Sequence, residues 1–236
     1  MTARSMKPGY TTRKLARTLA PALLFAVSAT AQTDLDSVLS KMNQTAAQFQ
    51  TAEANFTWIT YNSVVNEADR PQTGTIYFQR RGKETEMKAD IAPPDSEQVL
   101  FTEGKIQIYR ERMDTVDVYN AGAHREEAEA FLVLGFGSSG EEMRKSFEVK
   151  YDGTEQVDGV SAAKLLLTPK AENVKNHFPQ IILWIDPNTG MSVQQKLMET
   201  NGDYRLAKYS DIHPNKKISD KVFKLKTSDR TKFISH

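Results

Sequence analysis

Phe178-Pro179-Gln180-Ile181-Ile182-Leu183-Trp184-Ile185-Asp186-Pro187-Asn188-Thr189-Gly190 is the stretch that decides the fold. Its middle is rich in β-branched and aromatic residues, which favours a strand over about 179–186. Its end, from Asp186 to Gly190, has the composition of a tight turn. A strand that meets such a turn returns beside itself, so this stretch predicts an antiparallel hairpin.

The same pattern of short strands and turns recurs along most of the chain. Glu103-Gly104 and Asn201-Gly202 are turn sequences of the same kind. We therefore expect a mainly β protein with a few helices (α+β), built as a long antiparallel meander. Its strands are expected near residues 54–66, 73–80, 83–91, 97–103, 105–110, 113–119, 147–152, 159–168, 179–186, 191–199, 203–212 and 221–227.

Helical periodicity precedes the strands and interrupts them once. Apolar residues spaced by three and four predict a helix over 34–49: Leu35, Val38, Leu39, Met42, Ala46 and Phe49. A second helix is expected over 124–134. A third, short helix should follow it, capped by Ser138 or Ser139 with Glu141 or Glu142 completing a capping box.

The first 31 residues have the features of a cleavable export signal. Five basic residues (Arg4, Lys7, Arg13, Lys14 and Arg17) precede an apolar run from Leu19 to Ala29, and Ala29-Thr30-Ala31 supplies an A-x-A cleavage pattern. The run is shorter than the roughly 20 apolar residues of a membrane anchor. We therefore expect a signal peptide at 1–31 and a single domain at 32–236.

Composition narrows the function classes. Removing the five basic residues of the signal from 31 Lys and Arg leaves 26 against 30 Asp and Glu, a net charge of about −4. A protein with this net negative charge has no overall positive electrostatic potential that would attract nucleic acid. The chain has no cysteine, and its four histidines lack metal-ligand spacing. No catalytic residue, metal or cofactor is therefore predicted.

Two patterns suggest enzyme chemistry but favour other interpretations. Gly135-x-Gly137-x-x-Gly140 matches a dinucleotide motif, but that motif belongs between a strand and a helix of a βαβ unit. We interpret these glycines as part of a helix-to-helix turn. The pairs Glu84 with Glu86 and Glu126 with Glu127 leave open a carbohydrate-active enzyme that uses two carboxylates, although alternating carboxylates usually mark a solvated face.

The strands carry more apolar residues than one buried face requires. Leu165 to Leu167 and Ile181 to Ile185 are apolar on both faces. The N-terminal helix could cover the extra surface, or a lid could do so. Phe131-Leu132-Val133-Leu134 and Phe136, flanked by glycines, are too apolar for an exposed connection and are the candidate lid over an apolar cavity.

Ile76, Phe78 and Arg80 share one face of a strand by the two-residue period. The arginine at the end of this apolar row could extend into water, as long cationic side chains often do. Alternatively, it could lie at the rim of the cavity and donate hydrogen bonds to the lid backbone or to the polar head of a ligand.

The order of several motifs resembles the LolA family of lipoprotein carriers. These motifs are Phe56 opening the first strand, Gly74-x-Ile76-Tyr77-Phe78-x-Arg80, Pro94-Asp95-Ser96-Glu97-Gln98, Phe101-Thr102-Glu103-Gly104-Lys105, Tyr109, Phe131 to Leu134, Leu167-Thr168-Pro169-Lys170, and Phe178 to Gly190. The resemblance implies an incomplete antiparallel β-barrel of about eleven or twelve strands, with an N-terminal helix and a helical lid on its concave face.

The resemblance also implies a function. Members of the family carry lipoprotein acyl chains through the periplasm, from a lipoprotein-releasing ABC transporter of the inner membrane to an outer-membrane acceptor. By position, Arg80 matches the family's lid-contacting arginine, and Phe131 to Phe136 match its lid helix. The family commonly has proline and then an aromatic residue after this arginine, whereas Arg81, Gly82, Lys83 and Glu84 follow here.

The expected protein is thus a periplasmic, monomeric carrier of lipoproteins or other acylated cargo. Its candidate ligand-binding residues are Ile76, Phe78, Arg80, Phe131, Leu132, Leu134 and Phe136. A lipid-sensing regulator is the first alternative, and the carboxylate enzyme is the second. The basic tail from Lys216 to Lys232 is expected to form a solvated final strand, with contact to an anionic membrane as the alternative.

Overall fold

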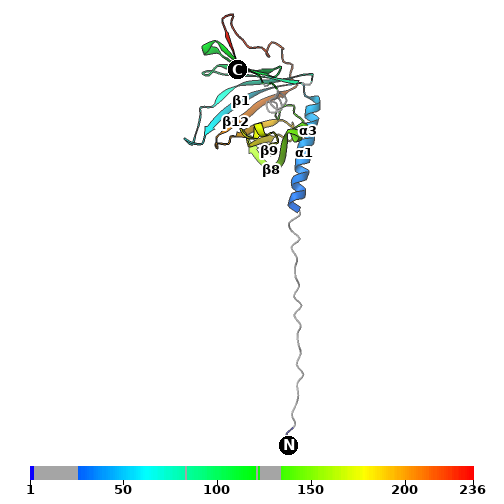
Figure 1. Cartoon of the computed structure of the whole chain (residues 1–236). Coiled ribbons are helices and arrows are strands. Elements are labelled where there is room, and N and C mark those ends of the chain that lie inside the picture. Colours follow the sequence, from blue (N-terminus) through cyan, green and yellow to red (C-terminus); the bar gives the residue numbers. More distant parts are fainter. Residues whose placement is uncertain (3–25, 83, 121, 123–133) are drawn as a thin grey trace.

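The computed structural model describes residues 1–2, 26–82, 84–120, 122 and 134–236. Within these residues, 13 strands form a single sheet, and a long helix, α1, runs beside it (Figure 1). The elements are α1 (Ala26–Gln48), β1 (Thr51–Asn62), β2 (Glu67–Ala68), β3 (Gln72–Arg81), β4 (Glu84–Ile91), β5 (Glu97–Thr102), β6 (Lys105–Arg110), η1 (Glu111–Met113), β7 (Thr115–Asn120), α3 (Gly140–Ser146), β8 (Phe147–Val157), β9 (Val160–Pro169), α4 (Glu172–Lys175), β10 (Gln180–Ile185), β11 (Ser192–Met198), β12 (Tyr204–Pro214) and β13 (Lys232–Ser235).

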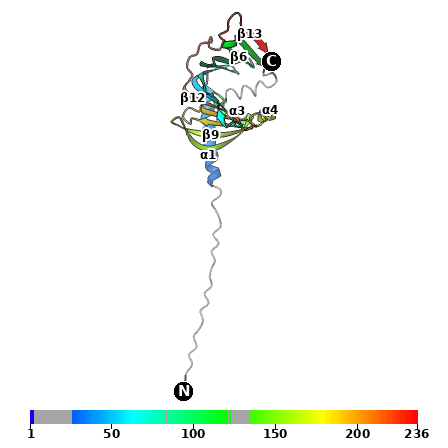
Figure 2. The ribbon, with the colours of Figure 1, turned by 90° about the vertical axis from the view of Figure 1, so that its left-hand side faces the viewer.

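The expected mainly β, incomplete barrel is confirmed. The order of strands is β13-β7-β6-β5-β4-β3-β1-β12-β11-β10-β9-β8, with β2 paired to β1. Two antiparallel meanders, β1 to β7 and β8 to β12, are joined by the pairing of β1 with β12, in which Phe56 lies opposite Tyr209. Because β13 and β8 are the two ends of the sheet, the sheet stays open, and Figure 2 shows β13 and β9 on opposite sides of the molecule.

The C-terminal segment departs from the predicted meander. No strand forms at 221–227, where one was expected: these residues form turns and irregular structure. The segment crosses the outer face of the sheet, the face opposite α1: Asp220 bonds Arg81 of β3, and the Lys226 amide donates to Gln98 of β5. Phe223, which belongs to this segment, is buried.

The final strand is also parallel, whereas the sequence predicted only antiparallel neighbours. β13 pairs with β7 in parallel, with Phe233 opposite Val116. The chain leaves the C-terminal end of β12 and crosses the outer face diagonally toward β7. It enters β13 at the edge of the sheet where β12 begins, so β13 runs in the same direction as β12 and β7.

α1 covers the inner face of the sheet with the residues that helical spacing predicted. Leu35, Val38, Leu39, Met42 and Ala46 are all buried. Most of them form one hydrophobic cluster with Leu134, Met143 and residues of β8, β9 and β10: Phe147, Ala163, Leu165, Leu167, Ile181, Leu183 and Ile185. The N-terminal helix therefore covers part of the extra apolar surface of these strands.

The other apolar residues of these strands lie on the outer face of the sheet. Trp184, Val157, Ala162 and Val193 form a smaller cluster there, and Trp184 is only 5 % exposed. Its indole Nε1 donates to Glu155 at 3.1 Å. The apolar residues on both faces of β10 are therefore explained by two separate clusters.

The short helix after the glycines has the predicted cap. Ser139 is the N-cap of α3, and its hydroxyl accepts a hydrogen bond from the Glu142 amide while the Glu142 side chain accepts from the Ser139 amide. The helix predicted over 124–134 lies outside the described residues except for Leu134. Most of the predicted signal segment, residues 3–25, lies outside them as well.

Candidate functional site: an apolar inner face and its cover

The inner face of the first meander is a continuous apolar surface. Its residues alternate along β1, β3, β4 and β5 with the two-residue period of a strand. They include Ala52, Ala54, Phe56, Ile76, Phe78, Met87, Ala89, Ile91 and Phe101. Ile76 and Phe78, both predicted as ligand-binding residues, lie in this surface and are 3 % and 1 % exposed.

Arg80 lies at the end of that apolar row and joins two segments that cross the inner face. One guanidinium nitrogen donates to the Ala46 carbonyl in the last turn of α1 at 2.8 Å. The other donates to the Gly137 carbonyl at 2.9 Å. A cation is favourable at the carbonyl end of a helix, where the helix dipole is negative. Arg80 therefore bonds two backbone carbonyls and does not simply extend into water.

Leu134 and Phe136 lie on the two halves of the inner face. Leu134 packs into the cluster of α1 with β8 to β10. Phe136 stacks on Phe78 with ring centroids 4.6 Å apart, and its edge meets Tyr209 at 4.7 Å. The segment from Leu134 to Gly140, which we call the cover segment, therefore bridges both halves. Phe131 and Leu132 lie outside the described residues.

The backbone of the cover segment is held by bonds from the sheet. Gln195 of β11 donates to the Leu134 carbonyl, and the Ser192 amide donates to the Gly135 carbonyl at 2.9 Å. Together with the bond from Arg80 to Gly137, three carbonyls of the cover segment have donors on the sheet. These bonds place Phe136 against the apolar face, where it is 1 % exposed.

The glycines of the cover segment allow close packing. Gly137 has φ +80°, and a Cβ there would lie 2.6 Å from Cγ of Phe49. Gly135 has φ +81°, and its Cβ would overlap Cβ of Ser192. Gly140 opens α3 against Leu39. The motif therefore serves contacts with α1 and β11, and it does not lie in a βαβ unit.

Sequence reasoning missed three contributors to this site: Phe49, Gln195 and Tyr209. The Arg80 guanidinium lies 5.6 Å from the centre of the Phe49 ring, just beyond the end of α1. The Tyr209 hydroxyl donates to the Gln195 side chain at 3.4 Å, and burial raises the pKa of Tyr209, which keeps the phenol neutral. The two-residue alternation with Leu197 could have placed Gln195 on the inner face.

The unusual Arg81 has a separate role on the outer face. It donates to Glu86 at 3.1 Å and to Asp220 of the C-terminal segment at 2.8 Å. Glu86 also accepts from Thr102, so this member of the Glu84–Glu86 pair is bonded within the sheet. Glu126 and Glu127 lie outside the described residues. Among the residues described, no group of three or more histidine, aspartate or glutamate side chains could hold a metal ion.

No helix within the described residues is both long and apolar enough to span a bilayer. No sequence among curated proteins matches the chain.

Solved structures are similar to this chain at low sequence identity. An uncharacterized conserved protein from Thermus thermophilus has a TM-score of 0.51 and 10 % identity over 88 % of this chain and 99 % of that one. MucB has a TM-score of 0.50 and 14 % identity over 82 % of this chain, which spans only 63 % of the MucB chain. A putative outer membrane lipoprotein-sorting protein domain from Vibrio parahaemolyticus has 11 % identity over 80 % of this chain and 97 % of that one, with a TM-score of 0.45.

The family model of the outer membrane lipoprotein carrier protein LolA matches residues 35–226, which include the inner face, the cover segment and most of the C-terminal crossing. The chain therefore belongs to the LolA family.

Proposed function

We propose that this protein is a periplasmic carrier that binds acyl chains of lipoproteins, or of a related lipid, on its apolar inner face and delivers them toward the outer membrane. The observation that carries the proposal is the cover segment. Its Phe136 side chain fills the apolar face at Phe78, and three hydrogen bonds to its carbonyls tie the segment to the sheet within the described residues. A cover held in this way can be exchanged for a ligand.

Displacement of the cover offsets part of the free energy that a bound acyl chain gains. Full burial of an aromatic or leucine side chain is worth about 1.5–3 kcal/mol, and burial of one methylene about 0.8 kcal/mol. About two to four methylenes of an acyl chain would therefore offset the displacement of the Phe136 side chain, and further methylenes are needed to offset the hydrogen bonds that break with the cover. A longer chain gains only the difference, so binding stays loose enough for release to an acceptor.

Arg80 is proposed to act as the latch of this cover. Its two bonds join the end of α1 to Gly137, so opening the cover breaks both of them. A hydrogen bond with a charged partner contributes about 1.5–3 kcal/mol when it is buried, and Arg80 is half-buried. The latch is therefore strong enough to close the empty protein and weak enough for an acyl chain to open it.

Export and delivery complete the proposal. A cleaved signal at 1–31 would leave the domain 32–236, and the family match begins at residue 35, just after that boundary. Family membership supports an inner-membrane lipoprotein-releasing ABC transporter as the donor and an outer-membrane protein as the acceptor. We propose that the carrier acts as a monomer and not as an enzyme.

The first test is to purify the protein from periplasm under mild conditions and to measure bound acyl material by native mass spectrometry. We expect a mass that corresponds to acylated cargo. The purified protein should also take up a fluorescent fatty acid, and Arg80→Leu should change the rate of exchange several-fold. Arg81→Leu removes an arginine from the outer face and is the matched control. No acyl mass together with no uptake of the probe would overturn the proposal.

A further inference from the structure

A groove opens in the sheet where β12 leaves β11. The two strands pair from Gln194 to Met198 and from Tyr204 to Lys208. In the described part of the chain, the rest of β12, Tyr209 to Pro214, pairs with β1 alone. In a strand, backbone groups point alternately to either side. This part of β12 therefore presents one free edge to the groove.

The groove is largely apolar and is bounded by three chain segments. It has a volume of about 300 Å³. Its walls come from the β8–β9 turn, the β10–β11 turn and the free edge of β12, and the apolar side chains are Val157, Val160, Met191, Val193, Tyr209 and Ile212. Tyr209 also contacts Phe136, so the groove and the cover segment share one neighbouring side chain.

The groove also has a negative rim. Asp158, Asp186 and Asp211 line it, and the side chains of Asp158 and Asp211 are 67 % and 64 % exposed. Lys208, which pairs with Asp158 at 3.3 Å, offsets one of these charges. An excess of carboxylate remains, which favours a cationic occupant and disfavours an anionic membrane surface.

We propose that this groove binds an extended segment of a partner protein in which apolar residues alternate with lysine or arginine. The segment would lie along the free edge of β12, place an apolar side chain between the partly exposed Val160 and Ile212, and set its basic residues against the rim. Backbone pairing supplies affinity in strand addition, and the side-chain pockets supply specificity. The site adjoins the acyl face of the proposed function at Tyr209 and Met191, but it is built on the free edge of β12 and does not depend on cargo.

The β12 edge itself limits the length of this segment. A bulge interrupts its pairing with β1, and Asp211 within the bulge has φ +51°. Bulges twist a strand and disturb regular pairing. Pro214, which has no amide hydrogen, ends the strand. The segment should therefore be short, with one or two apolar anchors.

The test uses a fluorescent peptide of alternating lysine and leucine and a matched peptide of alternating glutamate and leucine. Fluorescence anisotropy should show saturable binding of the lysine peptide, which weakens as salt increases, and no comparable binding of the glutamate peptide. Hydrogen exchange should slow at residues 209–214 when the lysine peptide binds.

The variant Asp158→Asn/Asp211→Asn removes two charges from the rim. Both residues have positive φ (+47° and +51°), which asparagine tolerates well, so the fold should be retained. We expect this variant to bind the lysine peptide about fivefold more weakly, as the loss of two exposed charge contacts implies. The control Glu172→Gln/Asp229→Asn removes two exposed charges outside the groove and should leave binding unchanged.

Three results would overturn the proposal. The first is equal binding of the lysine and glutamate peptides. The second is equal weakening by the rim variant and the control. The third is a dimer in sedimentation that the lysine peptide dissociates, because a second copy of this chain would then be the occupant.

Discussion

At the residue scale, Gly137 shows how one missing side chain shapes the site. An alanine at this position would have to hold φ at +80° and would also press its Cβ against the Phe49 ring. The backbone effect alone is worth about 1–2 kcal/mol. The contact with Phe49 adds to it, because Phe49 is 1 % exposed and has little space to move.

We therefore expect Gly137→Ala to lower the free energy of unfolding by about 2–4 kcal/mol, measured by urea denaturation. Gly153→Ala is the matched control, because Gly153 has φ +85° with nothing within 4 Å of its Cβ position. The difference between the two variants isolates the contact with Phe49. Equal destabilisation by the two variants would show that the contact with Phe49 adds nothing to the backbone effect.

Arg80 and Arg81 show that adjacent residues of a strand serve opposite faces. Arg80 bonds Ala46 and Gly137 on the inner face, and Arg81 bonds Glu86 and Asp220 on the outer face. We expect Arg80→Leu to speed amide hydrogen exchange at residues 137–140 several-fold. Arg81→Leu should speed exchange in the C-terminal segment around Asp220 instead. Acceleration of the same amides in both variants would contradict separate roles.

The sequence predicts these residues unequally. Two-residue alternation was enough to put Ile76, Phe78 and Arg80 on one face. It could not identify the partners of Arg80, which are two backbone carbonyls. A carbonyl is present in every residue and leaves no mark in the sequence.

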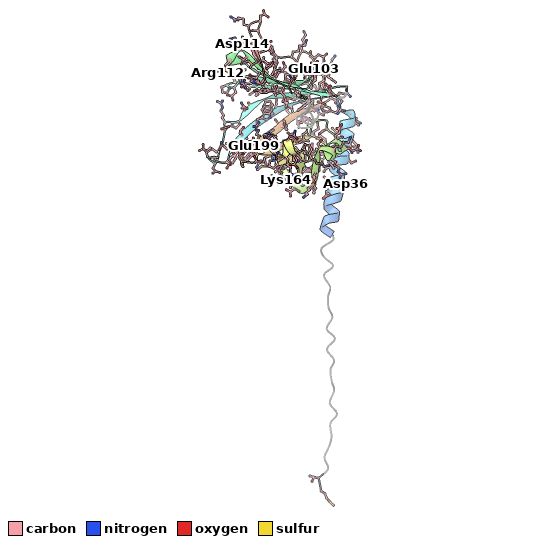
Figure 3. All side chains as sticks on the ribbon, viewed as in Figure 1. Asp36, Glu103, Arg112, Asp114, Lys164 and Glu199 are labelled. Carbon is pink, nitrogen blue, oxygen red and sulfur yellow. The ribbon has the colours of Figure 1, made fainter. Side chains whose placement is uncertain are left out.

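At the element scale, β13 is held at the edge of the sheet by two aspartates. Asp114 accepts hydrogen bonds from Ser228 at 2.9 Å and Thr231 at 2.5 Å. Asp117 lies 3.0 Å from the His236 ring and also bonds Arg110. Both aspartates lie near the β13 end of the sheet, and Figure 3 shows Asp114 there beside Arg112, far from Lys164.

These contacts make the attachment of β13 sensitive to acid. Hydrogen bonds from Thr231 and Ser228 lower the pKa of Asp114, and contacts with His236 and Arg110 lower the pKa of Asp117. A lowered pKa in the folded state contributes stability that is present above the unfolded value, about 3.9, and is lost as the pH falls through the folded value.

We therefore expect β13 to detach first below about pH 4, which would appear as faster hydrogen exchange at residues 232–235 than in β10. Asp114→Asn should produce part of this effect at neutral pH. Asp229→Asn, an exposed position close in sequence, is the control. Release of β13 and β10 at the same pH would contradict an independent attachment.

Elements that are close in sequence were predictable, and distant pairings were not. The hairpin of β10 and β11 was predictable from its own turn residues, Asp186 to Gly190. The pairing of β1 with β12 joins Phe56 to Tyr209, and no local signal selects that partner. The same holds for β13, whose parallel pairing with β7 depends on the path of residues 216–231 over the outer face.

At the scale of the whole molecule, the inner face is covered by pieces from different parts of the chain. α1 covers the β8–β10 half with Leu39 and Met42, while Phe136 covers the half that contains Phe78. Neither piece is a strand of the sheet, so both can move while the sheet remains paired. This division would give the proposed carrier a rigid frame and a replaceable cover.

If cargo replaces the cover, one variant should destabilise the empty protein and also increase the stabilisation that cargo provides. Phe136→Ala should lower the free energy of unfolding of the empty protein by about 3–5 kcal/mol, because it leaves a cavity beside Phe78. An acyl chain could fill that cavity without displacing an aromatic ring. A saturating fatty acid should therefore raise Tm more in the variant than in the wild type.

Differential scanning fluorimetry with and without the fatty acid measures the two increments. Leu167→Ala is the control, because Leu167 is buried in the cluster of α1 with β8 to β10, which does not contain Phe136. If Phe136 is the cover that cargo replaces, only Phe136→Ala should show the enlarged increment. Equal increments in both variants would mean that the fatty acid fills any cavity, and that Phe136 is an ordinary part of the core.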